Sequence, residues 1–327
     1  MPYEPEVLRR AYARHEERQR LHIEAFQVRQ AEIYRQLPRT REIERELRQS
    51  VVQAATAALR QGEDPAPAIH ALRRENQALQ EERRRLLEEA GWTEADLIEE
   101  PICDKCADTG WIGPKMCVCL QELCAEEQTN QLCQQLDLRN QTFDTFRLDY
   151  YPDVPGPGGS SPRSHMELVR DICRSYAARF GRSGIRNLFL TGGPGLGKTF
   201  LSAAIAGVVT QAGYSVVYDS VVEVFLSFEA EKFGRETRPS PYRYMKCDLL
   251  IMDDLGTELT TPFFQSALYQ LINQRLITGK HTVISSNLSL REIRERYSAQ
   301  VASRIEGEYR LLEFWGEDIR KIKNQVG

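Results

Sequence analysis

The first 100 residues show apolar positions at helical spacing. These positions recur every four or seven residues in two runs: Ile43, Leu47 and Val51, and then Leu72, Leu79 and Leu86. Pro38 and the segment 62–67 interrupt the pattern, because proline and glycine disfavour helix interiors. The spacing predicts three helices, at about 5–37, 39–60 and 66–90. The helices are rich in Arg and Glu and contain no Lys. They could form a solvated hairpin without chemistry, but we favour a module that docks a partner, because so polar a region has little core of its own.

The pattern changes after residue 100. Residues 101–135 crowd cysteines together, residues 136–165 read as a connector, and residues 166–327 alternate apolar strands with helices. The connector ends in a run rich in Pro and Gly, at 154–162, that is typical of a flexible linker. Strands that alternate with helices are typical of an α/β domain with a parallel sheet flanked by helices.

The strongest motif follows the first strand of this α/β region. An apolar strand at 188–191 leads into Gly-x-x-x-x-Gly-Lys-Thr at 192–199, and a helix follows. Such a loop wraps backbone N–H groups around a phosphate, and the N-terminus of the helix adds further donors. Lys198 can bridge phosphate oxygens and the Thr199 hydroxyl can bind Mg²⁺. A glycine-rich turn that fits the pattern by chance is the less favoured interpretation.

Two further strands end in polar residues. The apolar strand at 249–252 delivers Asp253, which can hold the Mg²⁺ shell, and Asp254, which can activate an attacking water. An ordinary strand with an acidic turn would look the same without the phosphate loop upstream. The strand at 282–286 ends at Asn287, which could orient that water or simply cap the strand before a helix. Ser289 and Glu292 form a capping-box pattern at the start of that helix.

Composition and charge narrow the class of protein. Hydrophobic residues make up 41% and the formal net charge is -4, so the chain as a whole is not a polybasic nucleic-acid binder, although a local basic face stays possible. The start of the chain has no apolar leader, and we expect a cytoplasmic protein. The uncharged run at 199–218 is long enough to raise a membrane span. It carries polar residues beside the phosphate loop, so we expect a buried helix and a buried strand instead.

Six of the eight cysteines lie between residues 103 and 133. A disulfide framework is typical of small secreted domains, so a metal site in a reducing compartment is the better interpretation. Cys103, Cys106, Cys117 and Cys119 could place four thiolates around Zn²⁺. The spacing of the last pair is tight, so Cys124 could replace Cys119. Reduced, buried cysteines without metal are the alternative.

Together these motifs resemble the bacterial replicative-helicase loaders of the DnaC/DnaI type, which are AAA+ ATPases grouped with the IstB-like transposition helpers. The matching segments are GGPGLGKT, LLIMDDLG, TVISSNLS and VASRIEGE, together with Thr142–Arg147, which is similar to the loaders' adenine-side linker. The resemblance covers about 140–327 and implies a P-loop AAA+ fold that hydrolyses ATP with Mg²⁺. Asp254, Asn287 and Arg304 would be the catalytic acid, sensor 1 and arginine finger. The nucleotide would contact Gly192, Gly193, Pro194, Gly195, Leu196, Gly197, Lys198, Thr199, Asp253 and, as sensor 2, Arg320.

The resemblance also implies partners. Subunits would associate in the ATP state as a homo-oligomer, bind single-stranded DNA in a pore and hold a replicative hexameric helicase through the N-terminal module. DNA contacts are expected at Phe228, Lys232, Phe233, Thr261 and Phe263, because aromatic rings stack on bases and cations follow phosphates. Each Phe could equally be a core residue. An IstB-like transposition helper and an ATP-gated DNA-binding assembly factor with little turnover are the alternative functions.

Overall fold

The structure is a computed structural model that describes residues 3–59, 66–155, 159–182, 184–235 and 238–326. Two compact units divide the chain. One contains residues 13–117, and the other combines residues 1–12 with residues 118–327. The break expected at 62–67 and the linker expected at 154–162 each lie partly outside the described residues.

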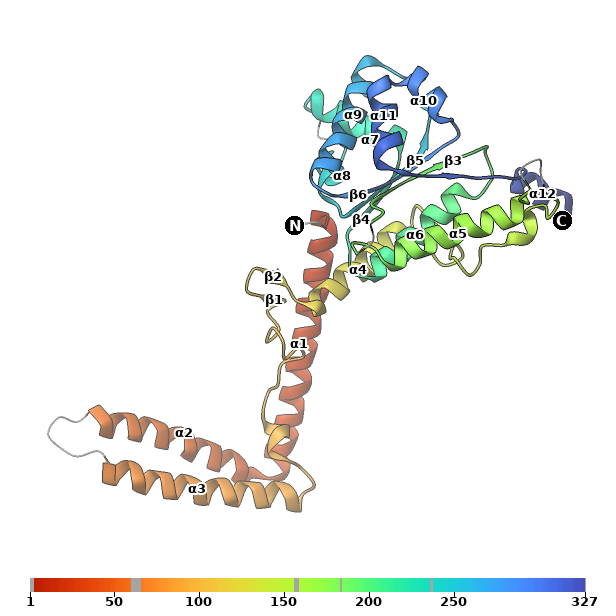
Figure 1. The fold of residues 1–327 in the computed structure, drawn as a ribbon. Coiled ribbons are helices and arrows are strands. Elements are labelled where there is room, and N and C mark those ends of the chain that lie inside the picture. Colours follow the sequence, from red (N-terminus) through yellow and green to blue (C-terminus); the bar gives the residue numbers. More distant parts are fainter. Residues whose placement is uncertain (1–2, 60–65, 156–158, 183, 236–237, 327) are drawn as a thin grey trace. The chain divides into compact units, whose positions relative to one another are not determined.

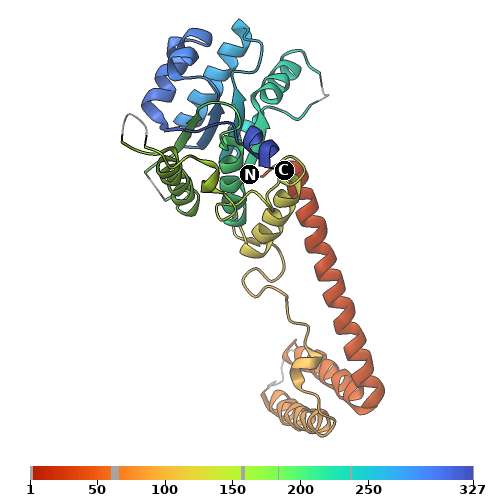
Figure 2. The same cartoon turned by 90° about the vertical axis from the view of Figure 1, so that its right-hand side faces the viewer.

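The unit of residues 13–117 is mainly helical. Helix α1 (Pro5–Gln36) enters it from the other unit, and α2 (Pro38–Leu59) and α3 (Ala66–Glu89) then run side by side (Figure 1 and Figure 2). These bounds confirm the three helices expected from the apolar spacing. Among the residues that the structure describes here, the buried apolar side chains other than cysteine are Phe26, Ile33, Ile43 and Leu87. A short 3₁₀ helix (Glu94–Leu97) and a two-stranded antiparallel hairpin, β1 (Trp111–Ile112) with β2 (Lys115–Met116), complete this unit.

A five-stranded parallel sheet forms the centre of the other unit, as the α/β pattern predicted. Its order is β4-β5-β6-β3-β7. The strands are β3 (Asn187–Thr191), β4 (Val216–Ser220), β5 (Leu249–Leu255), β6 (His281–Ser286) and β7 (Arg310–Glu313). Because all strands are parallel, their carboxyl ends meet at one edge. The loop after β3, the acidic end of β5 and the residue after β6 therefore lie together.

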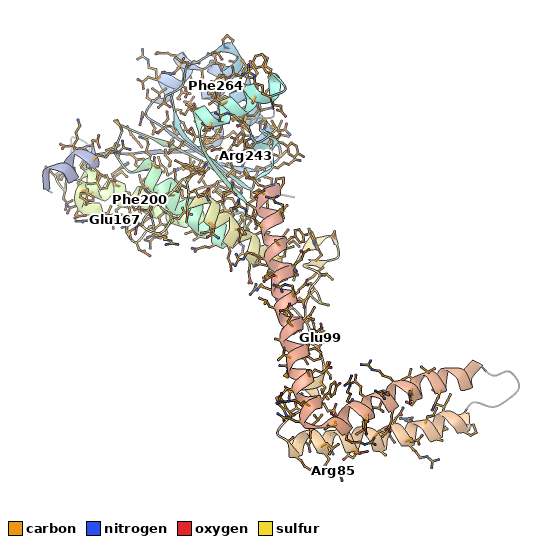
Figure 3. All side chains as sticks on the ribbon, turned by 180° about the vertical axis from the view of Figure 1, so that it is seen from behind. Arg85, Glu99, Glu167, Phe200, Arg243 and Phe264 are labelled. Atoms are coloured by element: carbon orange, nitrogen blue, oxygen red, sulfur yellow. The ribbon has the colours of Figure 1, made fainter. Side chains whose placement is uncertain are left out.

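Helices cover both faces of the sheet (Figure 1). One layer contains α4 (Val118–Leu132), α5 (Pro162–Ala178) and α6 (Lys198–Gln211). The other contains α7 (Val221–Lys232), α8 (Tyr242–Lys246), α9 (Pro262–Ile277), α10 (Leu290–Arg296) and α11 (Ala299–Glu308). Alternate residues of β3 serve the two layers: Leu188 and Leu190 join the first core and Phe189 the second. Figure 3 labels Phe200 in the first layer and Phe264 in the second. Helix α12 (Ile319–Val326) follows β7.

The uncharged run at 199–218 forms most of α6 and the start of β4, both largely buried, as expected. Among the described residues, no helix is both long and apolar enough to cross a membrane. The predicted capping box is also present, since Ser289 accepts a hydrogen bond from the Glu292 backbone and Glu292 accepts one from the Ser289 backbone.

Residues 3–12 pack against the sheet. The Tyr3 hydroxyl donates to the Gly213 carbonyl, and Val7 and Ala11 are buried. The Glu4 carboxylate accepts hydrogen bonds from Gln131 at 2.9 Å and from Arg243 at 3.0 Å, and Figure 3 labels this arginine. Arg243 also pairs with the carboxylate of Asp219 on β4. This set of contacts, which we call the N-terminal anchor, joins the start of the chain to residues more than 100 positions away.

Candidate functional site

The phosphate loop connects β3 to α6 and requires glycine at both ends. Gly192 has a φ of +142°, and a Cβ there would lie 2.6 Å from the Phe314 carbonyl oxygen. Gly197 has a φ of +90°, and a Cβ there would lie 3.0 Å from a ring carbon of Phe146. L side chains rarely adopt such backbone angles. The two glycines therefore allow the loop to pass close to β7 and to the segment before α5.

Lys198 begins α6 and points its ammonium into this loop. The Nζ atom donates to the carbonyls of Gly192 and Gly193, both at 2.7 Å, and to Oδ1 of Asn287 at 2.6 Å. Burial lowers the pKa of Lys198, against the opposing charges of Asp254 and Asp253. Asn287 follows β6, so the strand order brings it beside the loop. The ammonium of Lys198 is thus held by neutral oxygen atoms at the place where a phosphate would supply negative charge.

Asp253 lies at the end of β5 with 4% of its surface exposed. Its carboxylate accepts hydrogen bonds from the Thr199 hydroxyl at 2.9 Å, from the Tyr218 hydroxyl at 2.6 Å and from the Ser285 hydroxyl. The Thr199–Asp253 pair is the one proposed for Mg²⁺, and its two oxygen donors suit that hard cation. The roles of Tyr218 and Ser285 were not predicted from the sequence, because their only signal was a hydroxyl group near the carboxyl end of a strand.

Asp254 has an unusual backbone for a residue other than glycine, with φ at +59°. Its N–H donates to the Ser285 hydroxyl oxygen at 2.9 Å, which holds that conformation. Burial raises the pKa of the Asp254 carboxyl because it removes water from the ionised form. The negative charge of Asp253 raises this pKa further, and the positive charge of Lys198 lowers it. Strained residues of this kind cluster at functional sites. A carboxylate with a raised pKa at the mouth of a phosphate loop has the properties of a general base.

Residues 194–199 of the loop, Asp254 and Asn287 line one cavity of about 370 Å³, within the usual size of a small-molecule site, whereas Asp253 does not line it. Charged and amide groups form one part of its wall: Lys198, Asp254, Asn287 and Arg320. Rings and alkyl groups form another: Phe146, Tyr150, Leu196, Phe200 and Ile319. Thr145, Phe146 and Arg147 come from the segment expected on the adenine side. The cavity therefore offers polar groups for phosphates and apolar surface for a base.

Arg304 lies apart from these groups. It is half-buried on α11, and the described residues that line the cavity do not include it.

The residues expected at DNA divide into two sets. The Lys232 ammonium lies 4.2 Å from the centre of the Phe263 ring and 5.7 Å from that of Phe233, and Phe233 is 57% exposed. We call Lys232, Phe233 and Phe263 the cation–aromatic cluster. Phe228 instead packs against the second core, with its ring stacked on Tyr244 at 6.4 Å. Thr261 caps α9, where its hydroxyl oxygen accepts the N–H of Phe264.

The cysteines at 103, 106, 117 and 119 form a group whose sulfur atoms all lie within 4.8 Å of one another. Four thiolates around Zn²⁺, with Zn–S bonds of about 2.3 Å, have sulfur atoms about 3.8 Å apart, so small shifts would let the group hold the ion. The Asp108 carboxylate accepts hydrogen bonds from the backbone N–H groups of Ile102 and Cys103, both at 2.9 Å, which orders the turn that carries Cys103 and Cys106. Cys124 is buried on α4 outside this group, and burial raises the pKa of its thiol to about 11. The residues present therefore fit zinc, with Cys119 in the group.

Comparison with known proteins supports the nucleotide site. Residues 178–304 match the family described as IstB-like ATP binding protein. A putative ATP-binding protein of a Mycobacterium tuberculosis insertion sequence is 27% identical over 146 residues, 45% of this chain and 53% of that protein. The chromosomal replication initiator DnaA of Zymomonas mobilis is 28% identical over 142 residues, which are 42% of this chain and 29% of that protein.

A third relative is the replicative helicase loader DnaC of Buchnera aphidicola subsp. Baizongia pistaciae. It is 24% identical over 136 residues, which are 40% of this chain and 54% of the loader. The chain thus matches about half, or less, of the length of these curated relatives. The family match at residues 178–304 contains the phosphate loop and the acidic strand end, whereas the cysteine group lies outside this match.

Proposed function

We propose that this protein is an ATPase that loads a replicative hexameric helicase onto single-stranded DNA, because residues 178–304 match the IstB-like ATP binding proteins and a replicative helicase loader is among the relatives. The observation that carries the ATPase proposal is the shared cavity. Its wall holds Lys198 and Thr199 of the phosphate loop together with Asp254 and Asn287 from two other strand ends. Substrate binding and water activation therefore meet in one place.

Each group has a separate role in the proposed reaction. Lys198 exchanges its carbonyl partners for phosphate oxygens, and Asn287, its present partner at 2.6 Å, is released to orient water. Thr199 and Asp253 would hold Mg²⁺, which neutralises charge on the phosphates. Asp254 accepts the proton of the attacking water. Arg320, also in the cavity wall, adds a positive charge toward the phosphates.

The oligomer completes the site in this proposal. Arg304 lies on α11 outside the cavity of its own chain and carries the positive charge that a neighbour's γ-phosphate needs. ATP would thus join subunits through Arg304. Mixing Arg304→Ala with Lys198→Ala subunits should restore some ATPase activity, because mixed interfaces pair an intact arginine with an intact phosphate loop. Absence of any recovery in the mixtures would contradict the shared site.

The cation–aromatic cluster supports DNA contact. An ammonium next to two rings offers both phosphate attraction and base stacking, without reading sequence. Stacking contributes about 1–3 kcal/mol per base, so one subunit alone would bind weakly and an assembly would bind far better. Arg235, whose guanidinium carbon lies 5.5 Å from the centre of the Phe233 ring, extends the same surface.

The helical unit supports partner docking. Val51 and Val52 on α2 are each 66% exposed, although both are large apolar residues. A neighbouring protein surface would remove them from water. In the proposal this unit holds the helicase, and zinc bound by the cysteine group stabilises the segment that leads from it.

The insertion-sequence relative keeps a second function in view, that of a transposition helper acting on duplex DNA. A third candidate is an ATP-gated assembly factor with little turnover. The three functions predict different behaviour. A loader binds single-stranded DNA together with a helicase, a transposition helper binds duplex DNA, and an assembly factor binds either kind of DNA without hydrolysing ATP. The helical unit, which lies outside the family match, favours the loader.

The test measures fluorescence anisotropy of labelled single-stranded and duplex DNA with the full chain, with and without ATP. We expect single strands to be preferred, and only with ATP. Lys232→Ala should weaken that binding several-fold. Lys246→Ala is the matched control, because Lys246 is also exposed and lies 5.0 Å from the centre of an aromatic ring, that of Tyr242.

A second assay measures whether the chain places the replicative helicase on circular single-stranded DNA, which a closed ring cannot thread unaided. Val51→Asp should abolish loading and leave ATPase activity intact, whereas Gln53→Asp, an exposed neighbour on α2, should not. Equal loading by all variants would remove the docking proposal. A preference for duplex DNA would favour the transposition helper.

A further inference from the structure

Gln141 is a polar residue in the wall of the nucleotide cavity that no step above uses. Its side-chain oxygen Oε1 is buried and has no hydrogen-bond partner. Several other buried side-chain oxygens and nitrogens also lack partners, but among the described residues those that line this cavity include only Gln141. Buried carbonyl oxygens in folded proteins normally have a partner. The missing partner therefore points to a ligand.

The backbone around Gln141 is well fixed. The Gln141 N–H donates to the Asp137 carbonyl at 2.8 Å, and the Thr145 hydroxyl donates to the Asn140 carbonyl at 2.6 Å. Phe143 and Phe146 are buried just beyond it. The carboxamide is therefore presented from a rigid turn, and its orientation does not depend on a mobile loop.

Gln141 also belongs to the part of the wall where a base would lie. The same segment supplies Phe146 and Tyr150 to the cavity, while Lys198 and Asp254 line it from the phosphate loop and the end of β5. The Arg147 guanidinium carbon lies 4.7 Å from the centre of the Tyr150 ring, which keeps this aromatic wall ordered. A nucleotide whose phosphates occupy the loop would direct its base toward this segment.

A carboxamide carries one acceptor and one donor side by side. Adenine offers a matching edge, because its 6-amino group donates and its N7 accepts, whereas guanine offers two acceptors at O6 and N7. We propose that the Gln141 carboxamide binds this edge of adenine, with Oε1 accepting from the 6-amino group, and so sets the base preference of the site. The inference rests on nucleotide binding at the cavity and needs neither helicase nor DNA.

The test compares two proteins with two ligands. Wild type and Gln141→Met are titrated by calorimetry with ATP and with purine riboside triphosphate, which lacks only the 6-amino group. We expect wild type to bind ATP about tenfold more tightly than the analogue, the value of one good buried hydrogen bond. In Gln141→Met this ratio should fall to about one, because ATP loses the bonds from both its 6-amino group and N7 whereas the analogue loses only the bond to N7. GTP should bind wild type more weakly than ATP.

Gln134→Met is the matched control, because Gln134 is exposed seven positions upstream and should keep the wild-type ratio. A Gln141→Met protein that loses equal affinity for both triphosphates would show a structural role and overturn the inference, as would a wild type that binds both equally. If wild type binds no triphosphate, the nucleotide site itself fails. Tight ATP binding that ignores the 6-amino group removes only the role of Gln141.

Discussion

Changing two adjacent aspartates to asparagine should have opposite effects on stability. Asp253→Asn replaces a buried carboxylate that accepts three hydroxyl hydrogen bonds, from Thr199, Tyr218 and Ser285. An amide keeps one acceptor oxygen and adds donors, so at least one hydroxyl loses its partner. The cost is about 1–3 kcal/mol. For a unit of roughly 200 residues, each kcal/mol lowers Tm by about 2–4 °C.

Asp254→Asn should leave the fold intact and stop turnover. Its carboxyl has a raised pKa, which means that the folded protein disfavours the ionised form, and a neutral amide removes that penalty. Asparagine also tolerates the positive φ of this position. The Tm should stay equal or rise slightly, and ATP affinity should remain. Loss of the general base should lower kcat by about 10²–10⁴-fold.

Differential scanning calorimetry of the full chain without nucleotide or Mg²⁺ gives the two Tm values, and a phosphate-release assay gives turnover. Asp171→Asn on α5 serves as a control, because Asp171 is exposed and does not line the cavity. Equal loss of Tm in both active-site variants would contradict the hydrogen-bond argument. Wild-type turnover in Asp254→Asn would contradict the base assignment.

Three further predictions follow from other contacts. The ATPase rate should fall as the pH drops through the pKa of Asp254, which is raised above the ordinary value of about 3.9. A pH–rate profile whose acid limb falls at the ordinary value would contradict the role of Asp254 as the base. Gly197→Ala should weaken ATP binding and lower Tm, because its Cβ would lie 3.0 Å from a ring carbon at a φ of +90°. Gly207→Ala in α6 meets nothing within 4 Å and should raise the free energy of unfolding by up to about 1 kcal/mol. Arg243→Met removes the cation that Glu4 and Asp219 share and should lower the free energy of unfolding in urea by about 3–5 kcal/mol. Glu4→Ala should lower it less, because Arg243 keeps Asp219 as a partner.

The sequence predicted those features of the site that depend on local order. The phosphate loop, the acidic strand end and the capping box at Ser289 each lie within a dozen residues, so their spacing was readable. The parallel sheet followed from alternating strands and helices, and it explains why Asn287 reaches Lys198. That contact also requires β6 to lie next to β3 in the sheet.

The remaining contacts depended on which strands are neighbours. Tyr218 and Ser285 reach Asp253 because β4 and β6 flank β5, an order that no local pattern encodes. Phe228, expected at DNA, is half-buried and packs against the second core, since hydrophobic burial competes with exposure for any aromatic residue. The sequence could not predict the N-terminal anchor either, because Glu4 and Arg243 are 239 positions apart in the chain.

The N-terminal anchor changes how the helical unit is attached. Because residues 1–12 and residues 118–327 form one unit, residues 13–117 are inserted within it, and the chain leaves and returns at two separate places. A force applied to the inserted unit would act on the unit of residues 1–12 and 118–327 at both attachments. One is the covalent chain at α4, and the other is the noncovalent seat of Tyr3 and Glu4 beside β4. Because the second attachment is noncovalent, it would separate first under tension, and the pairing of Glu4 with Arg243 is one of the contacts that resist this separation.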